Sequence, residues 1–545
     1  MQTEVLIVGA GPTGLVLALW LSKLGVPVRI VDRSTSSGAA PRAFLLQART
    51  LEFYQQIGIA DDVLRRGKPI QSMAVHFEDG WTQHVPFGDF GRGLSPFPFV
   101  LLLLQDRHEK LLIDQLALAG VTVEWDTELV DLEDRADAAL AHLKGPRDAD
   151  EVCAARFVCG CDGQGSTVRD LLKIGFPGGS SEEIFYVADV EASGPPVDGA
   201  LHYLMTRDHL CSVFPLQGTG RVRLIGLVPA TVRQTQMQIG FDDISREIQL
   251  DTDLEVSLVE SFAIYRVHQR IADRWRKGHV LLLGDAAHVH SPAGGQGMNA
   301  GVGDAVNLAW KLAAVLKDGA PEALLDTYQA ERMTAVHQIA KTTGPGFALQ
   351  AGHGAAMRAF RRALTGLVPS LIQWRAFRRR LFMAISQLAI EYRRAGTCSG
   401  KAGRVVGGDR LPWVTFDDQT DNFAPLTGLG WQVQVYGEAR DSLRKSCAAW
   451  NLPLHVFART SSAVRAGLAR NAVYVIRPDG YVALASVTQA PAAIQRELDR
   501  LGIDLRRGSP AASGLSEVKD GRPTRGQVAR SGASHETRPD RRPSQ

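Results

Sequence analysis

The chain has 545 residues, enough for roughly three or four domains of average size. Hydrophobic residues make up 45% of the sequence, charged residues 22% and aromatic residues 7%, a composition that excludes a collagen-like, coiled-coil or wholly disordered chain. The formal net charge is +3, and residues 508–545, with seven basic and four acidic side chains, account for all of it. The balanced remainder gives no electrostatic reason to expect a nucleic-acid partner.

Cysteine and histidine usage favours a reducing compartment and no metal site. The six cysteines are too few for a disulfide framework and none forms a Cys-x-x-Cys pair, so we expect a cytoplasmic protein. His202 and His209 have no companion at metal-ligand spacing. No basic segment precedes the apolar stretch Thr3–Val8, and no apolar run approaches the ~20 residues of a membrane helix. We therefore expect neither a signal peptide nor a membrane span.

The chain opens with the pattern of a βαβ unit. Residues 4–8 predict a buried strand, Leu15–Leu24 continues as an apolar helix after a glycine turn, and Val28–Val31 predicts a second strand that ends at Asp32. Strands joined by a helix in this way favour an α/β architecture with a parallel sheet.

The remaining elements are expected in the following order. A helix over 105–120 and strands over 121–125 and 156–160 continue the first part, and β-like segments over 176–266 with one helix near 242–248 indicate an inserted, mainly antiparallel sheet. Then come a strand over 279–283, an amphipathic helix over 302–316, an arginine-rich helical segment over 346–400, and strands near 431–436, 453–457, 472–477 and 481–485. Residues 508–545 hold few large apolar side chains and are expected to be disordered.

Residues 9–14 carry a dinucleotide-binding fingerprint. Gly9 permits a tight turn, Gly11 lets the backbone approach a pyrophosphate, and Gly14 allows the helix to pack closely on the strand. The pyrophosphate would lie at the helix N-terminus, where free N–H groups favour an anion. Asp32 is the acid expected to accept hydrogen bonds from a ribose. These residues alone leave open which dinucleotide binds.

A second glycine-rich stretch, residues 284–299 (GDAAHVHSPAGGQGMN), lies between a predicted strand and the helix over 302–316. Free N–H groups at the start of that helix would face an anion, and Asp285 at the strand end could hold a hydroxyl group. A turn capped by Asp285, with glycines that only connect elements, explains the same residues without a ligand. The stretch by itself does not decide between the two.

Three separated motifs together resemble those of the class A flavin monooxygenases, which share the fold of para-hydroxybenzoate hydroxylase. They are GAGPTG at 9–14, Asp162-Gly163 before Ser166 and Arg169, and the stretch 284–299. The resemblance covers about residues 1–345 and implies tightly bound FAD, transiently bound NAD(P)H as reductant, and O2 as co-substrate. It does not distinguish NADH from NADPH. For Asp162-Gly163, a purely structural strand–turn–helix role is the alternative.

The resemblance implies cofactor-binding roles for residues of all three motifs. The turn at 9–14 matches the pyrophosphate site, Asp32 the ribose-binding acid that is often Glu in the family, and Asp285 the acid that holds the ribityl or phosphate portion. Other positions match residues that line the adenine, the phosphates or the isoalloxazine. The implied set is Gly9, Gly11, Pro12, Thr13, Gly14, Asp32, Arg33, Arg42, Gln105, Asp162, Gly163, Asp285, Pro292, Gly297 and Met298.

No catalytic acid or base is assigned. His288 and His290 lie beside the expected flavin loop, but a packing or hydrogen-bonding role is the favoured interpretation for a histidine after GDAA. Tyr265 is equally a candidate for the substrate pocket and for the core. In the arginine-rich segment a solvated helical face is favoured over a binding site for an anionic partner.

Other pieces resemble the phenol and polyketide hydroxylase branch of the family. They include Pro41-Arg42-Ala43, Gln47 and Arg49–Glu52, whereas Gly408–Pro412 and Val475–Gly480 resemble the thioredoxin-like C-terminal appendage of that branch. Because Cys447 has no neighbouring cysteine, we expect a structural role or an oligomer contact for the appendage and no dithiol chemistry.

The implied activity is NAD(P)H- and O2-dependent hydroxylation of a phenolic or polycyclic aromatic substrate through a flavin C4a-hydroperoxide. Baeyer–Villiger oxidation or epoxidation on the same scaffold, and a non-catalytic FAD-binding protein, are the alternatives. The expected partners are a small aromatic substrate and a second copy of the chain in a homodimer.

The expected fold class is α/β, a Rossmann-like FAD-binding domain with an inserted, mainly antiparallel β-sheet substrate domain and a thioredoxin-like C-terminal domain. The expected boundaries are 1–175 and 267–345 for the FAD-binding domain, 176–266 for the substrate domain, 346–404 for the arginine-rich helical segment, 405–507 for the thioredoxin-like domain and 508–545 for the disordered tail.

Overall fold

The structure is a computed structural model. It describes residues 2–38, 44–77, 82–86, 90–205, 210–229, 232–233, 239–290, 293–351, 374–416 and 420–504. These residues all belong to one compact unit, Met1–Gly508. The tail for which we expect disorder, 508–545, lies outside the described residues.

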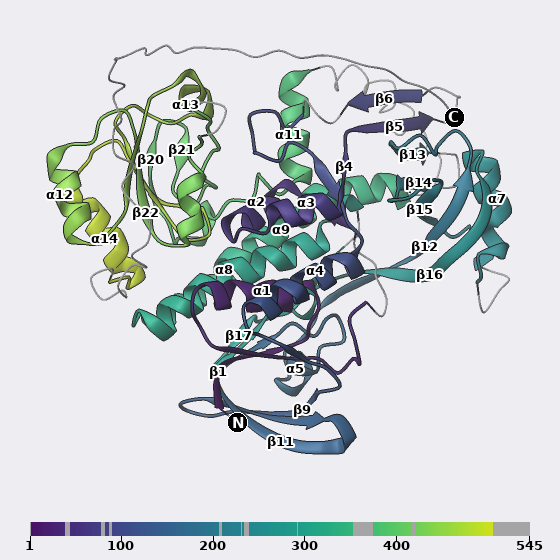
Figure 1. The fold of residues 1–545 in the computed structure, drawn as a ribbon, viewed down its shortest axis with the longest axis horizontal. Coiled ribbons are helices and arrows are strands. Elements are labelled where there is room, and N and C mark those ends of the chain that lie inside the picture. Colours follow the sequence, from purple (N-terminus) through teal and green to yellow (C-terminus); the bar gives the residue numbers. More distant parts are fainter. Residues whose placement is uncertain are drawn as a thin grey trace, which may run out of the picture. The chain divides into compact units, whose positions relative to one another are not determined.

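A mostly parallel sheet forms the first layer (Figure 1). Its central strands are fully buried apolar runs such as Val5–Ile7, as expected for a parallel sheet that is covered on both faces. Helices α1 (Pro12–Lys23), α4 (Gln105–Leu118) and α8 (Gly297–Lys317) pack together beside it. The strand order is β17 (Arg276–Lys277), β18 (Val280–Leu282), β11 (Ala149–Gly160), β1 (Gln2–Val8), β2 (Val28–Val31) and β8 (Val123–Glu124), with β9 (Glu128–Asp134) and β10 (Ala139–Gly145) paired onto β11.

A second sheet is antiparallel except where β13 meets β5. Residues 176–266 supply most of its length, as the β-like pattern predicts, and α7 (Asp242–Thr252) packs on one of its faces. Residues 72–77 and 82–86 join the same sheet, although the sequence pattern groups them with the FAD-binding part. The order is β19 (His288–Val289), β16 (Glu255–Ile271), β12 (Gly178–Ser193), β15 (Arg221–Leu227), β14 (Leu210–Pro215), β13 (Leu201–Met205), β5 (Ser72–Phe77) and β6 (Thr82–Pro86).

The C-terminal part of the chain forms a third sheet, flanked by α12 (Asp441–Ala449), α13 (Ser461–Ala466) and α14 (Pro491–Leu501). The four strands expected from the sequence are all present there. The order is β21 (Val405–Val406), β20 (Ser399–Ala402), β25 (Val482–Ser486), β24 (Val473–Ile476), β22 (Gln432–Tyr436) and β23 (Leu454–Phe457).

Shorter elements complete the FAD-binding part. A small sheet joins β3 (Leu45–Leu46), β7 (Val100–Leu102) and β4 (Lys68–Ile70). The short helices are α2 (Ala48–Gln56), α3 (Ala60–Arg66), α5 (Thr167–Leu171) and the 3-10 turns η2 (Gly284–Ala286) and η4 (Glu322–Leu325).

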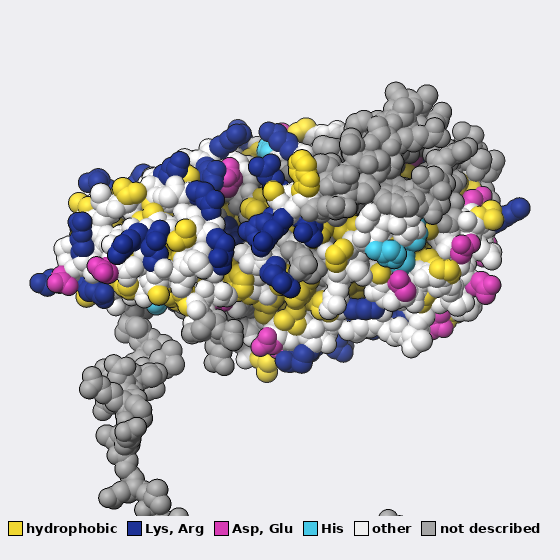
Figure 2. All heavy atoms as spheres, turned by 90° about the horizontal axis from the view of Figure 1, so that it is seen from above, with side chains coloured by type: hydrophobic (Ala, Val, Ile, Leu, Met, Phe, Trp, Pro, Cys, Tyr) yellow, Lys and Arg dark blue, Asp and Glu magenta, His cyan; other side chains and the backbone are white. Residues whose placement is uncertain are grey.

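The arginine-rich segment is only partly helical. Helix α9 (Asp326–Ala351) enters it and α11 (Arg375–Ile385) follows, with 352–373 outside the described residues, but the chain turns to strand β20 from Ser399, so a helix up to residue 400 is wrong. Lys and Arg side chains gather on the face in Figure 2. In α11 the guanidinium of the half-buried Arg378 lies 5.6 Å from the ring centroid of Phe90, a cation–π contact. In the part of the chain that the structure describes, no helix combines the length and hydropathy of a membrane span.

Candidate functional site

Three loops that are far apart in sequence meet at the carboxyl edge of the first sheet. The neighbouring strands β18, β11 and β1 run parallel, so the residues that follow them emerge at the same edge. Backbone hydrogen bonds extend this register into the loops, from Cys161 N to Val8 O at 2.7 Å and from Leu283 N to Gly160 O at 2.9 Å. The three motifs singled out in the sequence are therefore brought together by the order of the strands.

Two glycines of the first loop are required by packing. Gly9 has a φ of +106°, and a Cβ there would lie 2.4 Å from the carbonyl oxygen of Cys161. A Cβ on Gly14 would lie 2.0 Å from the carbonyl oxygen of Gly9. Both distances are far inside van der Waals contact, so neither position accepts a side chain without a shift of the backbone.

Gly11 is a glycine for a different reason. Its φ of −72° suits any residue, and a Cβ there would meet no atom within 4 Å. Gly11 is the N-cap of α1, has no side-chain cap, and is followed by Pro12, so the first N–H groups of the helix face the cleft that Gly11 lines. This open space at a helix N-terminus is a cradle that fits a pyrophosphate.

The cleft has a volume of about 260 Å³. Asp32 is half-buried in its wall, where Oδ2 accepts a hydrogen bond from the N–H of Ala10 at 2.7 Å and Oδ1 accepts one from the N–H of Ser34 at 2.8 Å. Arg33 is exposed at the same cleft. The lining residues are Val8, Gly9, Gly11, Asp32, Arg33, Ser34, Thr127, Glu128, Leu129, Cys161, Asp162, Gly163 and Thr167.

Asp162 has a structural role and also lines the cleft. Its carboxylate accepts hydrogen bonds from the hydroxyl of Ser166 at 2.6 Å and from the N–H of Val168 at 3.1 Å, at the start of α5. Burial raises the pKa of Asp162, against these hydrogen bonds. Gly163 takes a φ of +81°, in the left-handed region that favours glycine. The strand–turn–helix interpretation therefore describes the local structure, and it leaves the cleft-facing role open.

The third loop packs directly on the first. A Cβ on Gly284 would lie 2.6 Å from Oγ1 of Thr13, and its φ of +57° also favours glycine. Arg169 ties the second loop to the third, because its Nη1 donates to the carbonyl oxygens of Gln164 at 3.0 Å and Ala286 at 3.2 Å. Asp285, on η2, is exposed.

His288 is held in a buried polar cluster. Its Nε2 lies 2.7 Å from Oδ2 of Asp304, which also accepts the N–H of Gly284 at 3.0 Å, and its ring stacks on Trp275. Burial by itself would raise the pKa of Asp304, but the charges of Arg332 and His288 lower it below the ordinary value. This environment gives His288 the packing and hydrogen-bonding role that the sequence analysis favours.

The loop before α8 is held by amide side chains from two helix starts. Asn299 Oδ1 accepts hydrogen bonds from the N–H of Gln47 at 2.9 Å and the hydroxyl of Thr50 at 2.7 Å, and its Nδ2 donates to the carbonyl of Gly295 at 2.8 Å. Gln47 Nε2 donates to the carbonyl of Gly294 at 2.8 Å. The sequence analysis missed this bracing role, because Gln47 lies more than 200 residues away and only its resemblance to a branch motif drew attention to it.

The other expected site residues are distributed as follows. Gly297 and Met298 begin α8, and Gln105 begins α4, where its Nε2 donates to Oε1 of Glu109 at 2.8 Å. Tyr265 stacks on Phe185 with ring centroids 5.8 Å apart. Arg42 and Pro292 lie outside the described residues. Among the described side chains, no group of three or more His, Cys, Asp or Glu residues is arranged to hold a metal ion.

The parallel sheet, the glycine turn and the anion cradle define a dinucleotide-binding protein. Residues 2–343 match the family described as "FAD binding domain", and the chain belongs to that family. The resemblance to class A flavin monooxygenases, the α/β fold of their FAD-binding part and FAD as the cofactor are thereby confirmed.

Individual relatives agree with this family. The 6-methylpretetramide 4-monooxygenase of Streptomyces rimosus is 35% identical over 413 residues, which cover 73% of this chain and 72% of that protein. A protein named flavin-dependent monooxygenase from Mycobacteroides abscessus is 31% identical over 498 residues, 88% of this chain and 96% of its own. Among solved structures, the OxyS anhydrotetracycline hydroxylase from Streptomyces rimosus superimposes with a TM-score of 0.74 at 26% identity, covering 91% of this chain and 98% of that chain.

Proposed function

We propose that this protein is an FAD-dependent aromatic hydroxylase that uses NAD(P)H and O2 to add one oxygen atom to a phenolic or polycyclic aromatic substrate. The observation that carries the proposal is the meeting of three motif loops at one edge of the first sheet, two of which line a cleft with an open cradle at Gly11, in a chain of the FAD-binding family. The names of relatives that act on 6-methylpretetramide, anhydrotetracycline and pentachlorophenol support an aromatic substrate. Bound FAD supplies the redox chemistry and the activation of O2.

The chain's own residues hold the cofactor in this proposal. The N-terminus of α1 receives the pyrophosphate, Asp32 faces the ribose, and the start of α8 at Gly297 and Met298 directs N–H groups and a helix dipole at the flavin ring. Arg42 and Pro292 keep the roles that the family resemblance implies. For every other residue of the implied set, from Gly9 to Asp285, we likewise propose the role that the family resemblance implies.

We place the substrate over the second sheet. An aromatic contact joins this sheet to the FAD-binding part, because the ring centroids of Phe44 and Phe214 lie 4.7 Å apart in an edge-to-face arrangement. Within the sheet, the ring centroid of Tyr203 lies 6.3 Å from that of Phe214. Aromatic side chains at this contact would suit a planar ring, which they can stack on or meet with an edge.

The C-terminal part is proposed to be a thioredoxin-like domain. Its core follows the order β22–α12–β23–α13–β24–β25–α14, and β24 runs antiparallel to both of its neighbours, β22 and β25. This arrangement supports the proposed fold. Cys447 is buried, which raises the pKa of its thiol to about 11. A thiol with that pKa stays protonated at neutral pH, and Cys447 has no neighbouring cysteine in the sequence. We therefore propose no dithiol chemistry for this domain. A cytoplasmic location and a homodimer remain predictions from the sequence.

The deciding experiment measures oxidation of NADH and NADPH by the FAD-loaded protein, with and without a panel of simple and polycyclic phenols, and the mass and structure of each product. We expect substrate-stimulated oxidation and a product with one added oxygen on the ring. A ketone substrate converted to an ester would instead support Baeyer–Villiger oxidation. No stimulation by any compound, with FAD bound, would overturn the proposal in favour of a non-catalytic FAD-binding protein.

A further inference from the structure

The C-terminal part of the chain contacts α2 of the FAD-binding part through buried charges. Arg49, on α2, donates from Nη2 to the backbone carbonyl oxygen of Asp479 at 2.7 Å. Three residues later, Glu52 accepts a hydrogen bond from Nε of Arg410 at 2.8 Å and one from the hydroxyl of Ser95 at 2.6 Å. Arg49 and Glu52 are each only 2% exposed, so these contacts are sealed from water.

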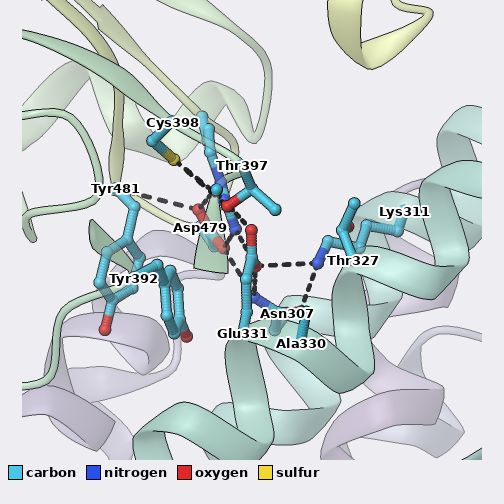
Figure 3. Close-up of polar contacts among 12 residues, drawn as sticks. Asn307, Lys311, Thr327, Ala330, Glu331, Tyr392, Thr397, Cys398, Asp479 and Tyr481 are labelled. Atoms are coloured by element: carbon cyan, nitrogen blue, oxygen red, sulfur yellow. Dashed lines mark hydrogen bonds and ion pairs between the residues drawn. The ribbon is translucent and has the colours of Figure 1, made fainter. Parts of the chain in front are cut away.

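Arg477 and Asp479, just after the end of β24, also contact α8 and α9 (Figure 3). Arg477 donates from Nη1 and Nη2 to the two carboxylate oxygens of Glu331, on α9, at 2.7 and 2.9 Å. Lys311, on α8, donates to the same carboxylate at 2.9 Å. The carboxylate of Asp479 accepts the indole N–H of Trp310 at 3.2 Å. One short C-terminal segment, residues 477–479, therefore touches α2, α8 and α9.

Buried charges of this kind fix geometry. Glu331 and Lys311 are fully buried, and Arg477 and Asp479 are 1% exposed. The charges of Arg477 and Lys311 lower the pKa of Glu331 against the effect of burial, so the carboxylate stays ionised. An ionised group in a dry interior is tolerated only while its partners keep their positions, because any displacement leaves a charge without compensation.

The two helices held in this way also meet at the loop expected to lie beside the flavin. At the start of α2, Gln47 and Thr50 hydrogen-bond with Asn299 near the start of α8, and Gln47 also binds the carbonyl of Gly294. Asn299 and Trp310 are eleven residues apart on α8, which is about 16 Å of continuous helix. A displacement of α8 at Trp310 or Lys311 is thus transmitted to Gly297 as a rigid-body shift.

We propose that the C-terminal domain is a positioning element for the flavin loop. Through Arg477 and Asp479 it fixes α2 and α8 relative to each other, and so sets the place of residues 294–298. The contacts described above support the link from Arg477 and Asp479 to residues 294–298, whereas its effect on the flavin rests on the proposed function. Arg477 and Asp479 are accordingly positioning residues, and neither touches the cleft.

Two full-length variants, each on one side of the contact between Trp310 and Asp479, test the link. Trp310→Phe keeps an aromatic ring but removes the N–H donated to Asp479 together with the five-membered ring of the indole, whereas Asp479→Asn keeps the side-chain size and removes the charge that Arg477 faces. Arg465→Gln is the matched control, because Arg465 is an exposed arginine on α13 whose side chain bonds to Ser462 in its own helix. The first readout is amide hydrogen exchange at 294–300 in the FAD-free protein. The second is the dissociation constant and reduction potential of bound FAD.

We expect both variants to accelerate exchange at 294–300 at least about fivefold and to weaken FAD binding about tenfold, the factor that corresponds to one lost buried hydrogen bond. The reduction potential should fall, because a shifted α8 N-terminus stabilises the negative charge of reduced flavin less well. Arg465→Gln should match the wild type. If both variants fold and their exchange at 294–300 and flavin potential are unchanged, the inference is wrong. A wild-type protein that lacks hydroxylase activity would overturn the proposed function while the exchange data still decide this link.

Discussion

Asp32 Oδ2 accepts a hydrogen bond from the backbone N–H of Ala10 at 2.7 Å, and this contact ties the acid after β2 to the glycine turn after β1. The other carboxylate oxygen accepts the N–H of Ser34. Asp32 therefore shapes the cleft as well as lining it. A substitution at Asp32 would disturb both the turn and cofactor binding. Substitutions at the glycines of the turn therefore distinguish effects on folding from effects on cofactor binding better.

Gly11→Arg is expected to abolish FAD binding and to leave the fold intact. The backbone of Gly11 suits any residue and its Cβ direction is open, so the arginine side chain extends into the pyrophosphate cradle. Gly14→Ala is the contrasting variant, because its Cβ would overlap the carbonyl of Gly9 and should destabilise the fold by about 1–3 kcal/mol. Flavin absorbance after gel filtration and thermal melting measure the two effects. Normal FAD content in Gly11→Arg would refute the site assignment.

Asp285→Ala should weaken FAD retention about tenfold, the loss expected for one hydrogen bond to a charged group, and should leave the melting temperature unchanged. The melting temperature should not change because Asp285 is exposed on η2. FAD retention should fall because Asp285 lies beside Gly284, which packs on Thr13 of the α1 turn. Asp137→Ala, at an exposed position in the β9–β10 turn, is the control. Flavin content is measured after extensive dialysis. Equal retention in the two variants would remove Asp285 from the site.

Glu52→Gln should destabilise the protein by about 3–5 kcal/mol, because it leaves Arg49 and Arg410 buried without their shared carboxylate. Glu133→Gln, which breaks the exposed pair with Arg135, should cost less than about 1 kcal/mol. Urea denaturation of the two variants gives the comparison. Equal free energies of unfolding would show that the contact between α2 and the C-terminal part of the chain contributes nothing to stability.

Lys311 should make stability depend on pH in the alkaline range. Burial lowers its pKa to about 8 in the folded protein, against an ordinary value of 10.5, so between these values the unfolded chain binds one proton more than the folded chain. The contribution of Lys311 to the free energy of unfolding therefore rises with pH from about 8 to 10.5, by about 1–3 kcal/mol. The free energies of unfolding of the wild type and Lys311→Met are compared by denaturation at pH values of about 7.5, 9 and 10. A difference between them that is constant with pH would contradict the expectation.

Several features of the site could be predicted because their signals are local. The alternation from strand to glycine turn to helix fixes the βαβ unit, and Gly9 and Gly14 are where the structure needs glycine. The favoured role of His288 also followed from its neighbours in sequence. By contrast, the bracing of Gly294 and Gly295 by Gln47 and Asn299 has no local signal, since each amide has many hydrogen-bond partners available until the helices pack.

The sequence by itself determined the order of the elements, the position of the cofactor turn and the family, because hydrophobic period and glycine spacing act over a few residues. Only the tertiary structure decided that β5 and β6 join the second sheet, and that Arg477 and Asp479 hold α2, α8 and α9. Such contacts depend on which buried faces meet once the chain is compact. A charge such as Glu331 finds its partners there because an unpaired charge is not tolerated in a dry interior.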